Sequence, residues 1–298
     1  MSDLIATACY RELGAELRRL REAAGLTGAE LAHKIGWTTT RVSRCELGYV
    51  HLNEVDLITY LGFCGVFGAY GNEWRAMCRE AEPKPGYWLR RHELGLPEGA
   101  YSLIYHESTA SASTSYEPEF VPGLLQTEAY IRAMVAERLP NSDVELAVRI
   151  RKERQQNLRR PVPCNFTFFI HEKALRLVVG NPAVMHEQML TLLLLDGLSH
   201  VAIRVVPAAA GVQAILEGSF RLFEYANHPP LVYLDGLTCG MFLEDREYVD
   251  DYRALLPDIA NLALNEGQSR EWLAALASAY DREGANPDAR DGVEEKHL

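Results

Sequence analysis

Apolar side chains in the first 65 residues recur at the spacing of α-helices. Four of them lie three or four positions apart and predict the buried stripe of a first helix: Leu13, Leu17, Leu20 and Ala24. Arginines take the other faces of this helix: Arg18, Arg19 and Arg21. Gly25 then ends it, because glycine readily adopts the backbone conformation that closes a helix.

Two shorter helices follow, and each starts at a threonine. Thr27 precedes Glu30 by three residues, which is the spacing of a capping box, and Gly36 ends the second helix. Thr38 is placed to cap the third helix, which Gly48 ends. The inward positions of these two helices are apolar: Leu31, Ala32, Ile35, Val42 and Cys45.

A fourth helix is predicted from Asn53 onward, to cover the first three. Its apolar positions are Val55, Leu57, Ile58 and Leu61. Two short helices joined by a tight glycine turn, between flanking helices, are typical of a helix-turn-helix. The sequence thus predicts an all-α N-terminal helix-turn-helix domain, with a fifth helix over residues 72–82.

Proline and glycine mark the predicted domain boundary. Pro83, Pro85 and Gly86 interrupt the helical pattern, so we place an N-terminal domain at residues 1–82 and a second domain at 83–282. Residues 283–298 are polar and without periodicity, which predicts a disordered tail.

The second domain mixes the two periodicities. Residues 108–115 are rich in small side chains and fit either a linker or a strand. Because the predicted strands lie mostly close together in the sequence, we expect an α+β domain with a mostly antiparallel sheet. The predicted helices span residues 127–138, 144–158, 182–198, 246–264 and 267–280. The predicted strands span residues 165–170, 201–206, 219–225 and 231–234. In the second of these helices we expect basic residues to face outward: Arg149, Arg151, Lys152, Arg154, Arg159 and Arg160.

Charge and composition narrow the possible roles. The 298 residues carry a net charge of −11, which argues against indiscriminate binding to nucleic acid, since phosphate affinity comes from Lys and Arg. Neither a membrane-spanning apolar run nor a secretion signal is found, so we expect a cytoplasmic protein. Six scattered cysteines form no C-x-x-C pair and no set at ligand spacing, so we predict no metal and no cofactor.

The N-terminal motifs resemble the XRE family of lambda-repressor-like DNA-binding domains. The matching runs cover most of the first domain: residues 17–21 (LRRLR), 25–27 (GLT), 30–32 (ELA), 35–38 (IGWT) and 42–48 (VSRCELG). Between Arg18 and Arg44, six basic residues stand against only Glu22 and Glu30, so positive charge is concentrated in this segment. The alternative is that this helix-turn-helix serves protein contacts alone.

The resemblance implies a role for individual residues of the third helix. Its N-terminal end would enter the major groove of duplex DNA, where Arg44 could bind a guanine through both arms of its guanidinium. The residues facing base edges would be Thr39, Thr40 and Arg44. Those approaching phosphates would be Arg41, Ser43 and Lys34. Arg21 and Glu46 match a family pair with a structural role, whereas Gly28 replaces a glutamine that often reaches the DNA backbone.

Distant runs in the second half resemble the C-terminal domain of a large family of regulators in filamentous actinobacteria, which is widely catalogued as of unknown function. They include residues 121–130 (VPGLLQTEAY), 154–156 (RQQ), 172–176 (EKALR), 205–207 (VVP) and 218–220 (GSF). The resemblance implies a sequence-specific transcriptional regulator. It would act as a homodimer whose C-terminal domain senses a partner protein or a small molecule.

Two further hypotheses concern this second domain. Six aromatic and polar residues are candidates for lining a ligand pocket, although packing and capping explain them equally well: Tyr116, Phe120, Gln126, Tyr130, Arg154 and Gln155. The alternative function is an antitoxin-like interaction protein, whose acidic segment at residues 244–258 would meet a small basic partner protein. We expect no enzyme, because the chain carries no P-loop, no G-x-S-x-G and no dinucleotide-binding fingerprint.

Overall fold

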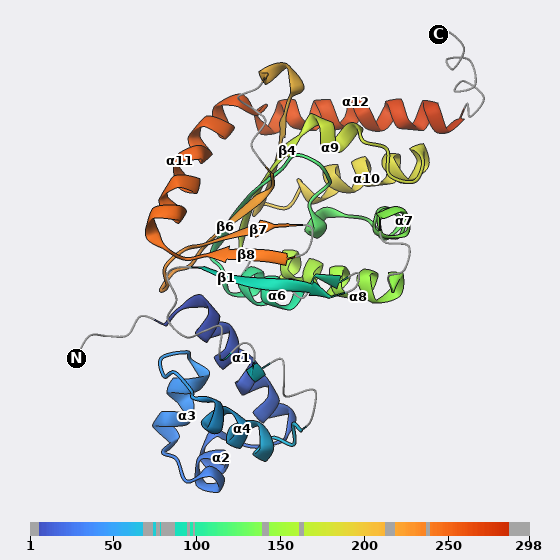
Figure 1. Ribbon diagram of the computed structural model, residues 1–298. Helices are drawn as coiled ribbons and strands as arrows, with labels where there is room; N and C mark the ends of the chain where they lie inside the picture. Colours follow the sequence, from blue (N-terminus) through green and yellow to red (C-terminus); the bar gives the residue numbers. More distant parts are fainter. Residues whose placement is uncertain are drawn as a thin grey trace, which may run out of the picture. The chain divides into compact units, whose positions relative to one another are not determined.

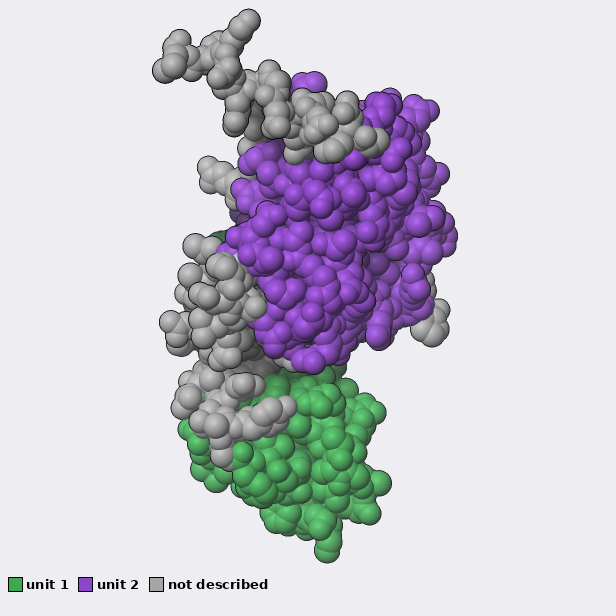
Figure 2. Space-filling model, turned by 90° about the vertical axis from the view of Figure 1, so that its right-hand side faces the viewer, with its two compact units in different colours: residues 1–89, 227–231, 242–248 green, residues 90–226, 232–241, 249–298 purple. Residues whose placement is uncertain are grey.

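The computed structural model divides into two compact units (Figure 2). Unit 1 comprises Met1–Leu89, Asn227–Leu231 and Phe242–Tyr248, and unit 2 comprises Arg90–Ala226, Val232–Met241 and Val249–Leu298. The structure describes residues 6–67, 74–75, 78, 87–93, 96–97, 99–138, 143–160, 164–211, 218–236 and 239–285.

The four N-terminal helices predicted from the sequence are confirmed. They are α1 (Ala8–Ala23), α2 (Gly28–Ile35), α3 (Thr39–Glu46) and α4 (Glu54–Phe63). Thr27 and Glu30 form the complete capping box at the start of α2, and the Thr38 side chain caps α3 by accepting from the Arg41 amide. Gly36 closes α2 with a φ of 71°, a left-handed conformation that favours glycine.

Fewer apolar side chains of the helical domain are buried than the sequence pattern predicted. Leu57 and Leu61 of α4 are buried as expected, but Val55 and Ile58 are 72% and 40% exposed. The reason is that α4 presents only one face to the other helices, and Leu57, Tyr60 and Leu61 fill that face. Ala24 is exposed because α1 ends before it, and Ile35 is only half-buried. Most of the predicted fifth helix, residues 72–82, lies outside the described residues.

A glycine in the middle of α1 allows this helix to approach the end of α3 closely. A Cβ atom on Gly14 would lie 2.6 Å from the carbonyl oxygens of both Cys45 and Glu46, which are backbone atoms. Gly48, at a φ of 77°, packs equally tightly against the backbone of Tyr10 and Arg11. The crossing of α1 and α3 therefore depends on backbone-to-backbone contact at these two glycines.

Residues 87–285 contain a mixed sheet with helices (Figure 1). The strands are β1 (Tyr87–Glu93), β2 (Leu96–Pro97), β3 (Ala112–Glu117), β4 (Asn165–His171), β5 (Val201–Val206), β6 (Phe220–Glu224), β7 (Leu231–Asp235) and β8 (Cys239–Leu243). The helices are α6 (Gly99–Thr109), α7 (Glu128–Arg138), α8 (Val144–Gln155), α9 (Glu172–Arg176), α10 (Pro182–Leu195), α11 (Arg246–Leu262) and α12 (Glu266–Ala285). The 3₁₀ turns are η1 (Gly123–Leu125), η2 (Gln156–Arg159) and η3 (Ala208–Ala210). The segment 108–115 is thus the end of α6 followed by β3.

The described strands form one sheet in the order β2-β1-β8-β7-β6-β3-β4-β5. The expectation of a mostly antiparallel sheet is wrong, because β3, β4 and β5 run parallel while β6 pairs with β3 antiparallel. Parallel neighbours need a crossover of a dozen or more residues, and the chain supplies two. Helices α7 and α8 join β3 to β4, and α9 and α10 join β4 to β5.

The two faces of the sheet are covered differently (Figure 1). Helix α11 covers one face, where the Arg204 side chain of β5 donates to the carbonyl oxygens of Ala260, Ala263 and Leu264. Helices α6, α8, α10 and α12 lie on the other face, which places α8 over β3 and β6. Arg154 of α8 was expected to face outward, but it points at the sheet and is only 6% exposed.

The ends of the predicted domains are only partly described. The proposed boundary at Pro83, Pro85 and Gly86 lies outside the described residues. Helix α12 continues to Ala285, past the predicted start of the tail, and residues 286–298 lie outside the described part. Within the described ranges, no helix combines the length and apolar character needed to cross a bilayer.

Gly14→Ala should destabilise the helical domain by about 1–3 kcal/mol, because the added methyl group forces α1 away from the end of α3. Hydrogen exchange of the α1–α3 amides in the full chain measures this loss. Gly28→Ala is the matched control, since a Cβ there meets only Val42 at 4.0 Å. Equal exchange rates in the two variants would contradict the close-approach argument.

Candidate nucleic-acid interface

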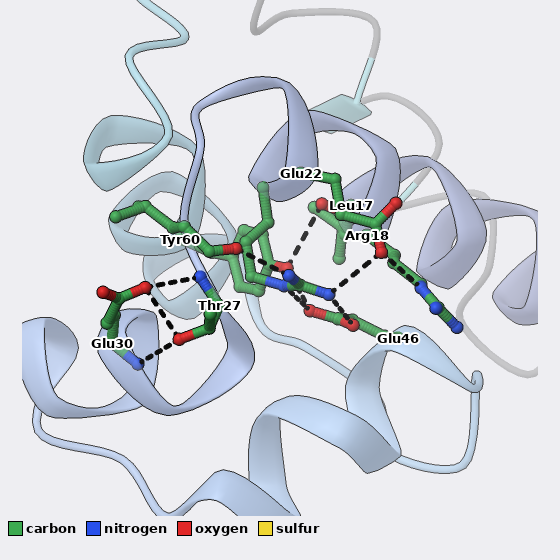
Figure 3. A network of polar contacts seen from close by, with 9 residues as sticks. Leu17, Arg18, Glu22, Thr27, Glu30, Glu46 and Tyr60 are labelled. Carbon is green, nitrogen blue, oxygen red and sulfur yellow. Dashed lines mark hydrogen bonds and ion pairs between the residues drawn. The ribbon is translucent and has the colours of Figure 1, made fainter.

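A buried ion pair between Arg21 and Glu46 joins the first and third helices (Figure 3). Arg21 Nε and Nη2 donate to the two Glu46 oxygens at 2.7 and 2.9 Å. The third nitrogen, Nη1, donates to the Leu26 carbonyl oxygen at 2.7 Å, just before α2. Glu46 also accepts from the Tyr60 hydroxyl of α4 at 2.6 Å. The Glu46 carboxylate therefore connects α1, α3 and α4, and Arg21 extends the network to the turn before α2.

This network is shielded from water. The side chains of Arg21 and Glu46 are 9% and 8% exposed, and Tyr60 is fully buried. Burial and the hydrogen bond to Glu46 raise the pKa of Tyr60 well above its ordinary value, so its hydroxyl remains a donor. The hydrogen bond to Glu46 also raises the pKa of Arg21, although burial opposes the change. Since α3 ends at Glu46, the network fixes the orientation of α3.

The outward face of α3 carries short polar side chains and one arginine. Four of its residues are exposed and lie on one face of the helix: Thr39, Thr40, Ser43 and Arg44. Lys34, near the end of α2, is exposed as well. Within the described ranges, neither Arg44 nor Lys34 forms an ion pair. Five of the six predicted DNA-contacting residues are therefore accessible and uncommitted.

Arg41, the sixth predicted DNA contact, is held against the protein surface by Asp56 and Trp37. Its Nη2 donates to Asp56 Oδ2 of α4 at 2.5 Å, and its guanidinium carbon lies 3.9 Å from the ring centroid of Trp37. Trp37 belongs to the turn between α2 and α3. The Arg41 side chain remains 40% exposed, so it can present one edge outward while it stabilises this turn.

The concentrated positive charge of the sequence is largely compensated in the folded chain. Arg18 pairs with Glu22, and Arg19 pairs with Glu16. Glu22 was one of the two acids counted in that segment of the sequence, whereas Glu16 lies before it. Trp37, Asp56 and Tyr60 were not singled out from the sequence. The one available signal was the spacing of Tyr60 from Leu57, which continues the inward face of α4.

The candidate pocket residues of the second domain are mostly committed to the core. Tyr116 and Tyr130 are fully buried. The Gln126 amide donates to the Val121 carbonyl oxygen at 2.7 Å, and the Gln155 amide donates to the Gln126 carbonyl oxygen at 2.7 Å. Phe120 is half-buried, 4.6 Å from the guanidinium carbon of Arg138. Packing and backbone hydrogen bonds therefore account for four of the six residues.

Arg154, the remaining candidate, belongs to a charged cluster between α8 and the sheet. Its Nη2 donates to Glu107 Oε1 of α6 at 2.7 Å, and Arg221 Nη1 of β6 donates to the same oxygen at 2.5 Å. Glu117, at the end of β3, lies 3.6 Å from Arg221 Nη2. Burial raises the pKa of Glu117 to about 7, although the nearby Arg221 charge opposes the rise. No set of side chains suited to a metal ion occurs among the described residues.

Fold and site together define a helix-turn-helix protein with an appended α+β domain. A family model described as a helix-turn-helix domain matches residues 12–69. A second model, the domain of unknown function DUF5753, matches residues 101–275, which is more than half of the chain. The chain belongs to the family that carries this domain of unknown function. No curated protein and no solved structure matches the chain.

Arg21→Met should destabilise the helical domain by about 3–5 kcal/mol, because it leaves Glu46 buried without its cation. The double variant Arg21→Met with Glu46→Leu should lose less than Arg21→Met alone, since no uncompensated charge remains. Hydrogen exchange of the α1–α4 amides measures both. If the two changes simply add, the ion pair does not couple these helices.

Glu117→Gln should stabilise the second domain at pH 8 and abolish part of its pH dependence. The folded chain keeps the Glu117 proton up to about pH 7, whereas the unfolded chain loses it near pH 4.5. Stability therefore falls as the pH rises from 4.5 to 7, by about 1–3 kcal/mol. Glutamine mimics the protonated acid and removes this loss. Urea unfolding at pH 5.5 and pH 8 tests it, and an unchanged pH profile would refute it.

Proposed function

We propose that the protein is a sequence-specific transcriptional regulator that reads duplex DNA with the outward face of α3. The helix-turn-helix domain itself indicates a DNA-binding regulator. The observation that carries the residue assignment is Arg44, which is exposed and unpaired within the described chain, on a helix oriented by the buried Arg21–Glu46 pair. A rigid helix with a free guanidinium fork suits a bidentate contact to guanine.

In this proposal Thr39 and Thr40 join Arg44 at the base edges. Their short side chains suit a thymine methyl group or a single hydrogen bond. Lys34, Ser43 and the exposed edge of Arg41 contact phosphates, which set the register without reading sequence. Since only two of these side chains are unpaired cations, non-specific affinity stays low and base contacts carry the discrimination.

The protein acts as a homodimer in this proposal, because one helix-turn-helix reads only one half-site. The second domain pairs two chains and receives the signal, a small molecule or a partner protein, that changes the separation of the two DNA-binding domains. The proposal gives the chain no catalytic activity.

The alternative is an antitoxin-like protein that neutralises a small basic partner. The exposed acidic side chains of α11 favour it: Glu247, Asp250, Asp251 and Asp258. Copurification of a small basic protein with the wild type, lost on charge reversal of these four positions, would favour this second reading.

Arg44→Ala should abolish selection of a two-fold symmetric site from a random DNA pool at fixed salt. The expected loss is about 1–3 kcal/mol for each guanine contact. Arg18→Ala is the matched control, because Arg18 is an exposed arginine of the same domain that pairs with Glu22. The wild type and the control should enrich the same sequence.

Failure of the wild type to enrich any sequence would overturn the regulator proposal. Equal losses in Arg44→Ala and Arg18→Ala would show that only overall charge matters. Hydrogen exchange of both variants checks that the helical domain remains folded.

A further inference from the structure

The outward face of α10 is apolar and exposed. Residues 189–195 (MLTLLLL) span about two helical turns and include one polar side chain, so apolar groups point in every direction around this part of the helix. Met189 and Leu192 are fully buried, whereas Leu190 and Leu194 are 43% and 76% exposed. A helix that is apolar on all sides is normally buried on all sides. The two exposed leucines therefore indicate a surface that another molecule covers.

Helix α12 lies beside α10 and runs in the opposite direction (Figure 1). A ring nitrogen of His186 lies 2.9 Å from the Ala277 carbonyl oxygen, in the first half of α10. At the other end, Arg270 of α12 donates through Nη2 to the Asp196 carbonyl oxygen at 3.1 Å and through Nε to the Asp196 carboxylate. These contacts hold α10 at both ends. Its exposed leucines thus belong to a fixed surface.

The exposed residues of α10 form a ridge with a charge at each end. We define the α10 ridge as the four exposed residues spaced three or four apart: Ala183, Glu187, Leu190 and Leu194. Within the described chain, Glu187 makes neither a hydrogen bond nor an ion pair. Arg270, at the far end of the helix, is 52% exposed, and no described residue accepts from its Nη1. An acid, two leucines and a cation therefore follow one another along the surface.

This order of groups is complementary to itself. When two α10 helices pack antiparallel about a two-fold axis at Leu192, Leu190 of one copy faces Leu194 of the other, because both lie two positions from the centre. Glu187 lies five positions before the centre. It therefore comes level with Gly197 of the other copy, next to the Asp196 that holds Arg270. Leucine meets leucine and acid approaches cation, and the two-fold axis repeats each contact.

We propose that the α10 ridge is the surface through which two copies of this chain dimerise. A second copy fits it better than the small basic partner of the alternative function, because a basic protein would find one acid on the ridge, Glu187, beside exposed leucines. A contact between identical surfaces also supplies the two-fold symmetry that paired DNA-binding domains need. The inference names the dimer surface of the proposed function and rests on it for its role in DNA recognition.

The mass of the full chain, measured by analytical ultracentrifugation over a range of concentrations, tests the surface. The wild type should be a dimer. Leu194→Glu should weaken the dimer about a hundredfold or more, since each of the two copies loses a buried leucine that accounts for about tenfold. Leu177→Glu is the matched control, because Leu177 is a 43% exposed leucine of the same domain outside the ridge. It should leave the mass unchanged.

The charge pairing and the register have tests of their own. Glu187→Lys should weaken the dimer about tenfold or more, because it sets a lysine against Arg270 at both ends. Glu153→Lys, the same change at an exposed position of α8, should have no effect. A mixture of Leu190→Cys and Leu194→Cys chains should form a mixed disulfide dimer faster than either variant with itself. Only the antiparallel register predicts that preference.

A monomeric wild type, or a wild type that carries a different molecule on this surface, would overturn the inference. So would a dimer that Leu194→Glu leaves intact, or one that Leu177→Glu disrupts equally. Hydrogen exchange of residues 182–195 checks that the ridge variants remain folded. DNA selection separates this inference from the proposed function. If Leu194→Glu stays dimeric while the wild type selects a two-fold symmetric site, only the ridge is rejected. A wild type that dimerises through the ridge but selects no DNA rejects the proposed function alone.

Discussion

The buried ion pair between Arg21 and Glu46 is the interaction on which the N-terminal domain depends. It links α1 to the end of α3, and through Leu26 and Tyr60 it reaches the turn before α2 and helix α4. Such a pair adds little net stability compared with apolar packing, but removing one partner is costly. Its effect is therefore to select one arrangement of four short helices. An outward helix face can discriminate bases only when its angle is fixed in this way.

Most arginines on α1 and α3 of this domain are paired with an acidic side chain. On α1, three arginines pair with glutamates, and on α3 Arg41 pairs with Asp56. Within the described chain, the exposed unpaired cations of α2 and α3 are therefore Lys34 and Arg44. In a protein with a net charge of −11, this arrangement suppresses general attraction to DNA. In the proposed function, affinity for DNA then depends on the few side chains that also carry specificity.

The second domain also contains a buried cluster of charged side chains. Glu107 satisfies one edge of Arg154 and one nitrogen of Arg221. Arg154 and Arg221 share the Glu107 carboxylate, which ties α8 and β6 to α6.

The sequence alone determined whatever depends on near neighbours along the chain. The four N-terminal helices, their threonine caps, the glycine stops and the strands β4 to β7 follow from periodicity and local hydrogen bonding. The third helix and its outward residues follow from the same patterns. Only the tertiary structure decided the direction of β4 and β5, because strand pairing depends on how a crossover helix packs. It also decided which arginines are free, since Arg41, Arg154 and Arg221 find their acids 15, 47 and 114 residues away. Distances of that kind are set by packing, and no spacing along the chain encodes them.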